Sequence, residues 1–260
     1  MNLSPHVFTF PFLLPRVVAL LRNWPVYLLH YLGRTGRPAR YLLRDGRVLV
    51  DEPGTLAGTF AVVFIRREYG VFRDLRTIVD IGANMGTFAV YAAGLCPQAR
   101  ILCVEPEPRN YARLQEHLRM NNLSDRVTAL PLAIGGRAGP RRLALRDSPV
   151  HSLIAEQSDA QFLEVPCTTL PELLRENGMT QVDLLKINCE GMEYEILETL
   201  TAADVAGIDR IRMEYHNLDG GRRNGPAARA RLEELGFHIE RYSRYRDSSG
   251  FIWARREGVP

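Results

Sequence analysis

Two patterns of apolar and polar positions divide the chain near residue 60. Over residues 12–32 the apolar positions recur at helical spacing, and Pro25 predicts a kink or a second helix start. Residues 35–60 are rich in Gly and Arg with short apolar runs, which indicates a small hairpin or connector. We therefore predict a helical cap and connector over residues 1–60. Its helical face carries Leu21, Trp24, Leu28 and Leu32, and it either covers the main domain or binds a membrane surface or a partner.

From Thr77 onward, short apolar runs alternate with helical patterns. Strand–helix–strand repeats build βαβ units and therefore a parallel sheet, and only a loop separates the last two runs, which predicts a terminal antiparallel hairpin. The predicted fold class is α/β, with a mostly parallel, Rossmann-like sheet over residues 61–260. The predicted strands are 77–81, 100–104, 127–132, 182–187, 208–215, 237–242 and 250–254, with helical faces over 88–95, 111–118, 168–176 and 192–200.

The loop after the first predicted strand is a candidate ligand site, because open α/β sheets bind ligands at the carboxyl ends of their strands. It lacks the full G-x-G-x-x-G pattern of dinucleotide sites, and the Asp80 carboxylate would repel a pyrophosphate. That charge instead attracts the ammonium and sulfonium of S-adenosylmethionine, while the following helix start favours its carboxylate. A tight turn without a ligand is the alternative. The predicted cofactor-binding residues here are Asp80, Gly82, Ala83, Asn84, Gly86, Thr87 and Phe88.

The segments after the next strands extend this predicted site. Glu105 ends the second strand, where a carboxylate accepts hydrogen bonds from ribose hydroxyls, and Pro106 follows it. Small apolar residues after the third strand, among them Ala133, suit an adenine ring. His151 and Ser152 lie in a Pro- and Ser-containing loop that either closes over the cofactor or is an ordinary surface loop.

Five blocks, in this order along the chain, resemble the FkbM-type S-adenosylmethionine-dependent methyltransferases. Of these, the block K-I-x-x-E-G-x-E-Y is the most specific to that family. The resemblance implies a class I methyltransferase fold, S-adenosyl-L-methionine as cofactor, and methyl transfer, usually to a hydroxyl of a sugar, polyketide or other specialised metabolite. The blocks are Asp80–Gly86, Val104-Glu105-Pro106, His151-Ser152-Leu153, Asp183–Tyr194 and Glu214-Tyr215-His216.

One position departs from the family pattern. Asn188 stands where the family usually has Asp. An amide keeps its hydrogen-bonding capacity but has no charge with which to accept a proton or bind a metal strongly. We therefore assign Asn188 to the cofactor side as a positioning group rather than as a base.

Side chains at the ends of the fourth and fifth strands form the predicted acceptor side. Methyl transfer from a sulfonium needs an aligned acceptor oxygen and a group that removes its proton. Glu214 and His216 have the same parity on the fifth strand, so both leave one face. We predict His216 as general base, oriented by Glu214, with structural hydrogen bonding as the alternative.

A lysine inside an apolar strand needs a carboxylate partner, which extends the predicted catalytic set. Lys186 is expected to pair with Glu190 or Glu193, either for catalysis or to fix the loop after the fourth strand. Glu193 also lies near a helix start, where the helix dipole explains an acidic residue. The predicted catalytic residues are His216, Glu214, Glu190 and Lys186.

Composition narrows the possible partners. Hydrophobic residues make up 46% of the chain and charged residues 24%, and the net charge of +3 gives no reason to expect a nucleic acid. No apolar stretch is long enough for a membrane span, and no secretory signal is evident, so we expect a cytoplasmic protein with reduced cysteines. A divalent metal is not expected, because a site from Glu214, His216 and Asn188 would be poor in charge.

The leading function is an O-methyltransferase acting on a small-molecule or glycan acceptor. An NAD-dependent dehydrogenase and a cofactor-binding protein without catalysis are the alternatives. Specificity is expected from the cap and from the loops at 140–165 and 217–230, and the oligomeric state is left open. Arginines over 220–231 indicate either a solvated loop and helix start or a lid for a phosphorylated or carboxylated acceptor.

Overall fold

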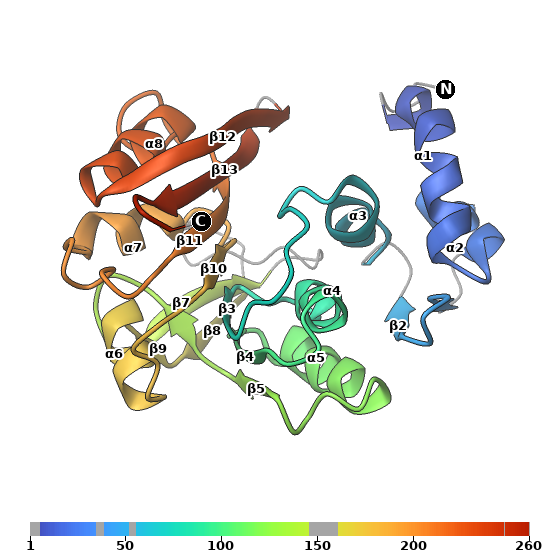
Figure 1. Cartoon of the computed structure of the whole chain (residues 1–260), viewed down its shortest axis with the longest axis horizontal. Helices are drawn as coiled ribbons and strands as arrows, with labels where there is room; N and C mark the ends of the chain where they lie inside the picture. Colours follow the sequence, from blue (N-terminus) through green and yellow to red (C-terminus); the bar gives the residue numbers. More distant parts are fainter. Residues whose placement is uncertain (1–5, 35–38, 52–55, 146–160, 247, 260) are drawn as a thin grey trace.

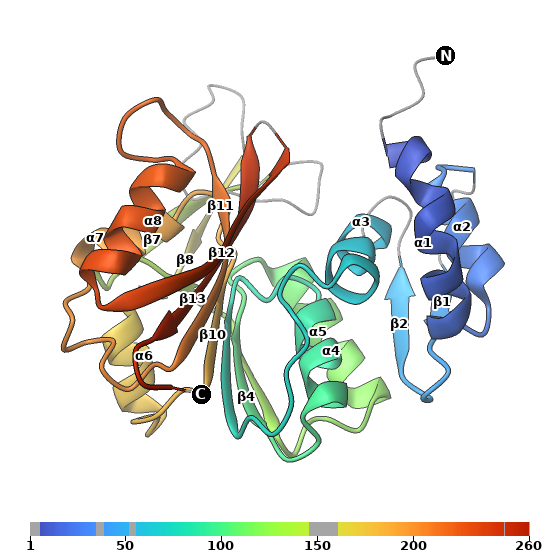
Figure 2. The same cartoon turned by 45° about the horizontal axis from the view of Figure 1, so that its top comes forward.

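The fold has three layers, with a central sheet between two sets of helices (Figures 1 and 2). It was obtained as a computed structural model, which describes residues 6–34, 39–51, 56–145, 161–246 and 248–259. Within these residues no helix is both long and apolar enough to cross a membrane.

The sheet confirms the predicted α/β class. Its seven strands run in the order β12-β13-β11-β10-β3-β4-β5, and only β13 is antiparallel to its neighbours. The terminal hairpin therefore inserts its second strand between β11 and β12. The strands are β3 (Thr77–Ile81), β4 (Arg100–Val104), β5 (Val127–Leu130), β10 (Leu184–Ile187), β11 (Arg210–His216), β12 (Phe237–Arg246) and β13 (Ser249–Arg256).

Helices cover both faces of the sheet, which explains why the inner strands are apolar on both sides. Figure 2 shows α4 (Thr87–Leu95) and α5 (Pro108–Met120) on one face. On the other face lie α6 (Leu170–Glu176), α7 (Glu193–Thr199) and α8 (Gly225–Glu234). Two hydrophobic clusters, one per face, fill the space between these layers.

The N-terminal region packs outside the α4–α5 layer (Figure 2). Pro25 begins a second helix, as one of the two readings predicted, because proline is favoured in a first helical turn. Backbone amides of β2 donate to His117 Nε2 and Asn121 Oδ1 of α5, at 2.8 Å each. The elements are α1 (His6–Leu20), α2 (Trp24–Tyr31), β1 (Ala39–Leu42), β2 (Val48–Asp51), α3 (Ala57–Phe60) and a π-helical turn η1 (Ala61–Arg66).

Two small strand pairs were not predicted. A short parallel pair joins β6 (Ala133–Ile134) to β9 (Cys167–Thr168), and an antiparallel pair joins β7 (Arg141–Leu145) to β8 (Gln161–Val165). They lie beside the carboxyl end of the sheet, where Ala133 and Leu143 reach the pocket described below. The predicted loop residues His151 and Ser152 lie outside the described residues.

Candidate active site

The loop after β3 is formed by backbone conformations and close contacts that require glycine. Gly82 and Gly86 have φ angles of 70° and 79°, in the left-handed region. A Cβ atom on Gly82 would lie 1.8 Å from the Asn188 carbonyl oxygen. On Gly86 it would lie 2.4 Å from Cδ1 of Leu114. The glycines therefore let the β3 loop pack directly against the β10 loop and α5.

Asp80 and Lys186 form a buried ion pair beneath this loop. Lys186 Nζ lies 2.8 Å from Asp80 Oδ1, and the two side chains are 4% and 0% exposed. The ammonium also donates to the carbonyl oxygens of Ile81 and Gly82, at 3.3 and 2.7 Å. The prediction that Lys186 needs a carboxylate partner is confirmed, but Glu190 and Glu193 were the wrong candidates, because the parallel register of β10 and β3 places Lys186 beside Asp80.

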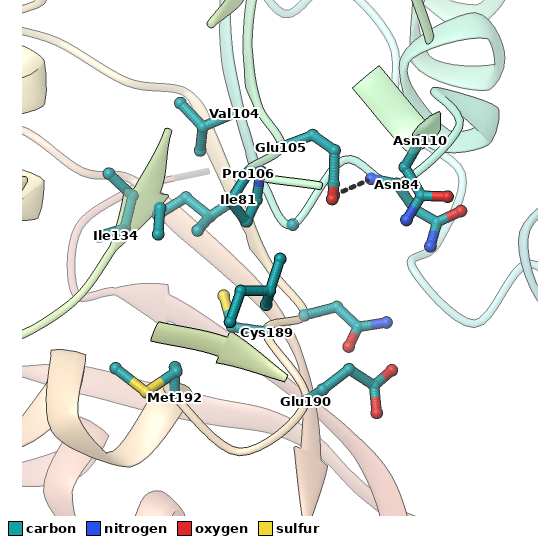
Figure 3. Close-up of a pocket in the computed structure, with 14 residues that line it drawn as sticks. Ile81, Asn84, Val104, Glu105, Pro106, Asn110, Ile134, Cys189, Glu190 and Met192 are labelled. Carbon is teal, nitrogen blue, oxygen red and sulfur yellow. Dashed lines mark hydrogen bonds between the residues drawn. The ribbon is translucent and has the colours of Figure 1, made fainter. Parts of the chain in front are cut away.

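A pocket opens above this ion pair, between the ends of β3, β4 and β10 (Figure 3). It holds about 600 Å³ of space, part of which is open to solvent. Its walls are mainly apolar, and the polar groups gather at Glu105, Asn84, Asn110, Asn188 and Glu190. The apolar lining includes Ile81, Val104, Pro106, Ala133, Ile134, Leu143, Cys189 and Met192.

Glu105 is the buried carboxylate of this pocket. Its Oε2 accepts from the Asn84 backbone N–H at 2.8 Å (Figure 3). Its Oε1 accepts from the Glu107 N–H at 3.0 Å. Burial raises the pKa of Glu105 to about 7, although these backbone hydrogen bonds oppose the rise. The Asn110 side chain is a third hydrogen-bond donor to this carboxylate. A carboxylate has about four lone-pair sites, so capacity remains to accept a ligand hydroxyl.

The predicted cofactor residues divide into two groups. Gly82, Asn84, Glu105, Pro106, Ala133 and Asn188 line the pocket. Asp80, Ala83, Gly86, Thr87 and Phe88 are not among its lining residues, and Phe88 packs in the core with its ring centroid 5.4 Å from that of Tyr69. Asp80 thus contributes to the site through the loop that it and Lys186 hold.

His216 lies at the end of β11 between two carboxylates. Its Nδ1 is 2.9 Å from Glu193 Oε1, and its Nε2 is 3.4 Å from Glu190 Oε2. Burial by itself lowers the pKa of His216, but the hydrogen bond and charge of Glu193, together with Glu190 and Glu214, raise it to about 9. The imidazole is therefore protonated at neutral pH, and Glu193 rather than the predicted Glu214 orients it.

Glu193 connects three segments of the chain. From the sequence it was predicted only as a partner of Lys186 or as an acidic residue favoured at a helix start. It is 0% exposed. Besides the His216 ring, its Oε1 accepts from the His216 backbone N–H at 2.9 Å, and its Oε2 accepts from the Gly191 N–H at 2.7 Å. This carboxylate fixes the end of β11 against the loop after β10.

Glu214 belongs to a second cluster on the same face of β11. Its Oε2 accepts from the Tyr69 hydroxyl at 3.1 Å and from Asn188 Nδ2 at 2.9 Å. Within the described part of the chain its Oε1 accepts no hydrogen bond. Burial raises the pKa of Glu214 to about 7, with the charge of His216 opposing the rise. A carboxyl of this kind is half ionised near neutral pH.

The arginines over residues 220–231 were predicted to belong either to a solvated loop and helix start or to a lid. Arg229 and Arg231 of α8 pair with Glu233 and Glu234, and Arg231 also donates to main-chain carbonyls, which agrees with the interpretation as a solvated loop and helix start.

Among the described residues, no group of three His, Cys, Asp or Glu side chains could hold a metal ion. The four cysteines carry free thiols, and Cys189 lines the pocket.

Comparison with known proteins identifies the family. Residues 80–239 match the methyltransferase FkbM domain, which is more than half of the chain. This chain belongs to the FkbM methyltransferase family. The membership accounts for both the glycine loop and the block from Lys186 to Tyr194, and it argues against the dehydrogenase alternative.

Two curated relatives and one solved structure illustrate the similarity. The methyltransferase sdnD of Sordaria araneosa is 30% identical over 213 residues, which cover 69% of this chain and 81% of that one. The 31-O-demethyl-FK506 methyltransferase FkbM of Streptomyces tacrolimicus is 26% identical over 174 residues, covering 55% and 66%. The solved structure of methyltransferase FkbM from Methylobacillus flagellatus matches with a TM-score of 0.49 at 14% identity, covering 95% of this chain and 59% of that one.

Proposed function

We propose that this protein transfers a methyl group from S-adenosylmethionine to a hydroxyl of a small-molecule or glycan acceptor. The observation that carries the proposal is the position of Glu214, a carboxyl with a pKa near 7, next to a pocket that suits the adenosyl donor. Asn188 connects the two, since it lines the pocket and donates to Glu214. The name of the relative 31-O-demethyl-FK506 methyltransferase FkbM refers to a substrate that lacks an O-methyl group, which supports oxygen as the acceptor atom.

The pocket residues fit the donor. Ile134, Leu143 and Met192 provide apolar walls for an adenine ring, and Glu105 provides acceptors for ribose hydroxyls. Asn188 Oδ1 is buried and has no hydrogen-bond partner among the described residues, which suits it to accept from a ligand ammonium or hydroxyl. When bound, S-adenosylmethionine supplies a methyl group already activated on sulfonium.

The chain's own residues then have to position an acceptor and accept its proton. We assign the role of proton acceptor to Glu214, because its Oε2 is held by two donors while its Oε1 accepts no hydrogen bond from the residues that the structure describes. His216 has carboxylates at both ring nitrogens and a pKa of about 9, so it is ill suited to accept a proton at neutral pH. Its positive charge instead favours the ionised form of Glu214, as the lowering effect on that pKa indicates.

Two steps test the proposal. Isothermal titration with S-adenosylmethionine, S-adenosylhomocysteine and NAD identifies the donor, and we expect binding of the two adenosyl ligands only. Glu105→Gln should weaken that binding about tenfold, because it removes the charge and replaces one of the two acceptor oxygens with an NH2 group. Glu195→Gln is the control, since that residue bonds Arg141 outside the pocket.

The donor complex is then incubated with panels of alcohols, sugars and amines, and products are identified by mass spectrometry and NMR. Methylation at oxygen supports the proposal. Tight NAD binding, or methylation confined to amines, contradicts it. Adenosyl binding without transfer to any acceptor in the panels would favour the cofactor-binding protein that the sequence left open.

A further inference from the structure

We infer that Tyr69 is a positioning residue for Glu214, so that the segment joining η1 to β3 completes the acceptor side of the site. The inference rests on the proposed function, because it assigns Tyr69 a part in holding the proposed proton acceptor. Tyr69 lies outside the residues that match the family domain. No motif in the sequence marks it.

Two hydrogen-bond donors meet at Glu214 Oε2. The Tyr69 hydroxyl donates to this oxygen at 3.1 Å, and Asn188 Nδ2 donates to it at 2.9 Å. Asn188 Nδ2 also lies 3.3 Å from the Tyr69 oxygen, so the amide bridges the phenol and the carboxylate. With Oε2 fixed by these donors, the carboxyl plane is set and Oε1 is directed away from them.

Aromatic packing fixes the Tyr69 ring. Its side chain is buried, and its centroid lies 5.4 Å from that of Phe88 and 5.5 Å from that of Phe251, both edge-to-face. Lys186 Nζ lies 5.7 Å from the ring centroid on the side of the glycine loop. These contacts with side chains of α4, β13 and β10 hold the ring, so its hydroxyl keeps one position.

The backbone around Tyr69 is fastened on both sides. The Trp253 indole donates to the Glu68 carbonyl at 2.7 Å, and the Tyr91 hydroxyl donates to the Gly70 carbonyl at 2.8 Å. Arg241 pairs with the Glu68 carboxylate at 2.8 Å. Residues 68–70 therefore form an anchored strap between the N-terminal region and the sheet, with Tyr69 directed at Glu214.

The charges and hydrogen bonds around Glu214 determine how its pKa should change when the Tyr69 hydroxyl is removed. His216 and Lys186 favour the ionised carboxylate, Glu190 opposes it, and the Tyr69 hydrogen bond favours it. Tyr69→Phe removes that hydrogen bond and keeps the ring. The pKa of Glu214 should then rise, by about one unit for a hydrogen bond to a charged group. The rising limb of the activity profile should move to higher pH by the same amount.

The chain offers a matched control. Tyr91→Phe also removes a buried hydroxyl bonded to this strap, but its acceptor is the Gly70 carbonyl rather than Glu214. We would measure the Glu214 carboxyl by ¹³C NMR titration in the wild type and both variants, with Glu214→Gln to assign the signal. The pH dependence of methyl transfer is recorded in parallel.

A raised Glu214 pKa in Tyr69→Phe, with no change in Tyr91→Phe, supports the inference. An unchanged pKa in Tyr69→Phe, or an equal rise in both variants, overturns it. The titration needs no acceptor, so a protein that transfers no methyl group would refute the proposed function while the NMR result still decides whether Tyr69 tunes Glu214.

Discussion

The two halves of the site are built by different means. On the cofactor side, at the ends of β3 and β4, the site is formed mainly by the backbone, through glycine φ angles and the amides that bind Glu105. On the acceptor side, at the ends of β10 and β11, side chains from distant segments meet, as Tyr69 and Glu214 do. We therefore expect substitutions on the cofactor side to lower the stability of the fold, whereas substitutions on the acceptor side should mainly change the rate and pH dependence of the reaction.

The buried ion pair beneath the glycine loop gives the largest expected effect on stability. Lys186→Met leaves Asp80 buried without its cation and removes two hydrogen bonds from the loop, which should cost about 3–5 kcal/mol of unfolding free energy. Urea unfolding at pH 7 measures it. Because burial already raises the pKa of Asp80, the variant should regain stability as the pH falls. A loss below about 1 kcal/mol would show that the pair does not support the loop.

The glycine loop gives a somewhat smaller effect. In Gly82→Ala, the new Cβ would meet the Asn188 carbonyl oxygen at 1.8 Å in addition to adopting a left-handed φ, and we expect a loss of about 3 kcal/mol together with loss of donor binding. Gly178 has a similar φ of +64°, but a Cβ there would have nothing within 4 Å, so Gly178→Ala should lose only about 1 kcal/mol. Equal losses in the two variants would mean that the contact with the β10 loop is unimportant.

A third prediction concerns the pH dependence of stability at the acceptor side. The pKa of His216 is raised from 6.5 to about 9, so its contribution is fully present below pH 6.5 and is lost as the pH rises through 9. The unfolding free energy should fall by about 2 kcal/mol over this interval. His216→Gln should be less stable at pH 6.5 and should lose most of that slope. A slope that persists in the variant would assign it to other groups.

Much of the fold followed from sequence periodicity. The buried β3 and β4 runs and their flanking helices are confirmed, because continuous apolar segments between helical patterns have few other structures available. The β7–β8 pair was missed, since neither strand shows a regular alternation of apolar and polar residues and the two pair across an intervening segment. Helix α8 was anticipated only as a helix start, because its Ala- and Arg-rich sequence has no clear apolar period.

The site was predicted only in part. Glu105 and the glycines could be found because their place at a strand end gives them a local signal. The partner of Lys186 could not be predicted, because the pairing depends on the strand register that places Lys186 beside Asp80. Tyr69 has no local signal, and the motif that contains Glu193 does not show which side chain it holds. Both roles come from contacts made across the folded chain.

The most direct test of the account is the single-turnover rate of methyl transfer from preformed donor complex in wild type and Glu214→Gln, measured from pH 5 to 9. The account predicts a wild-type rate that rises through about pH 7, where Glu214 ionises. In Glu214→Gln it predicts a rate lower by about a hundredfold or more at pH 8, without that rise and with donor affinity unchanged. A variant that keeps the wild-type rate and pH dependence would contradict the assignment of Glu214 as proton acceptor.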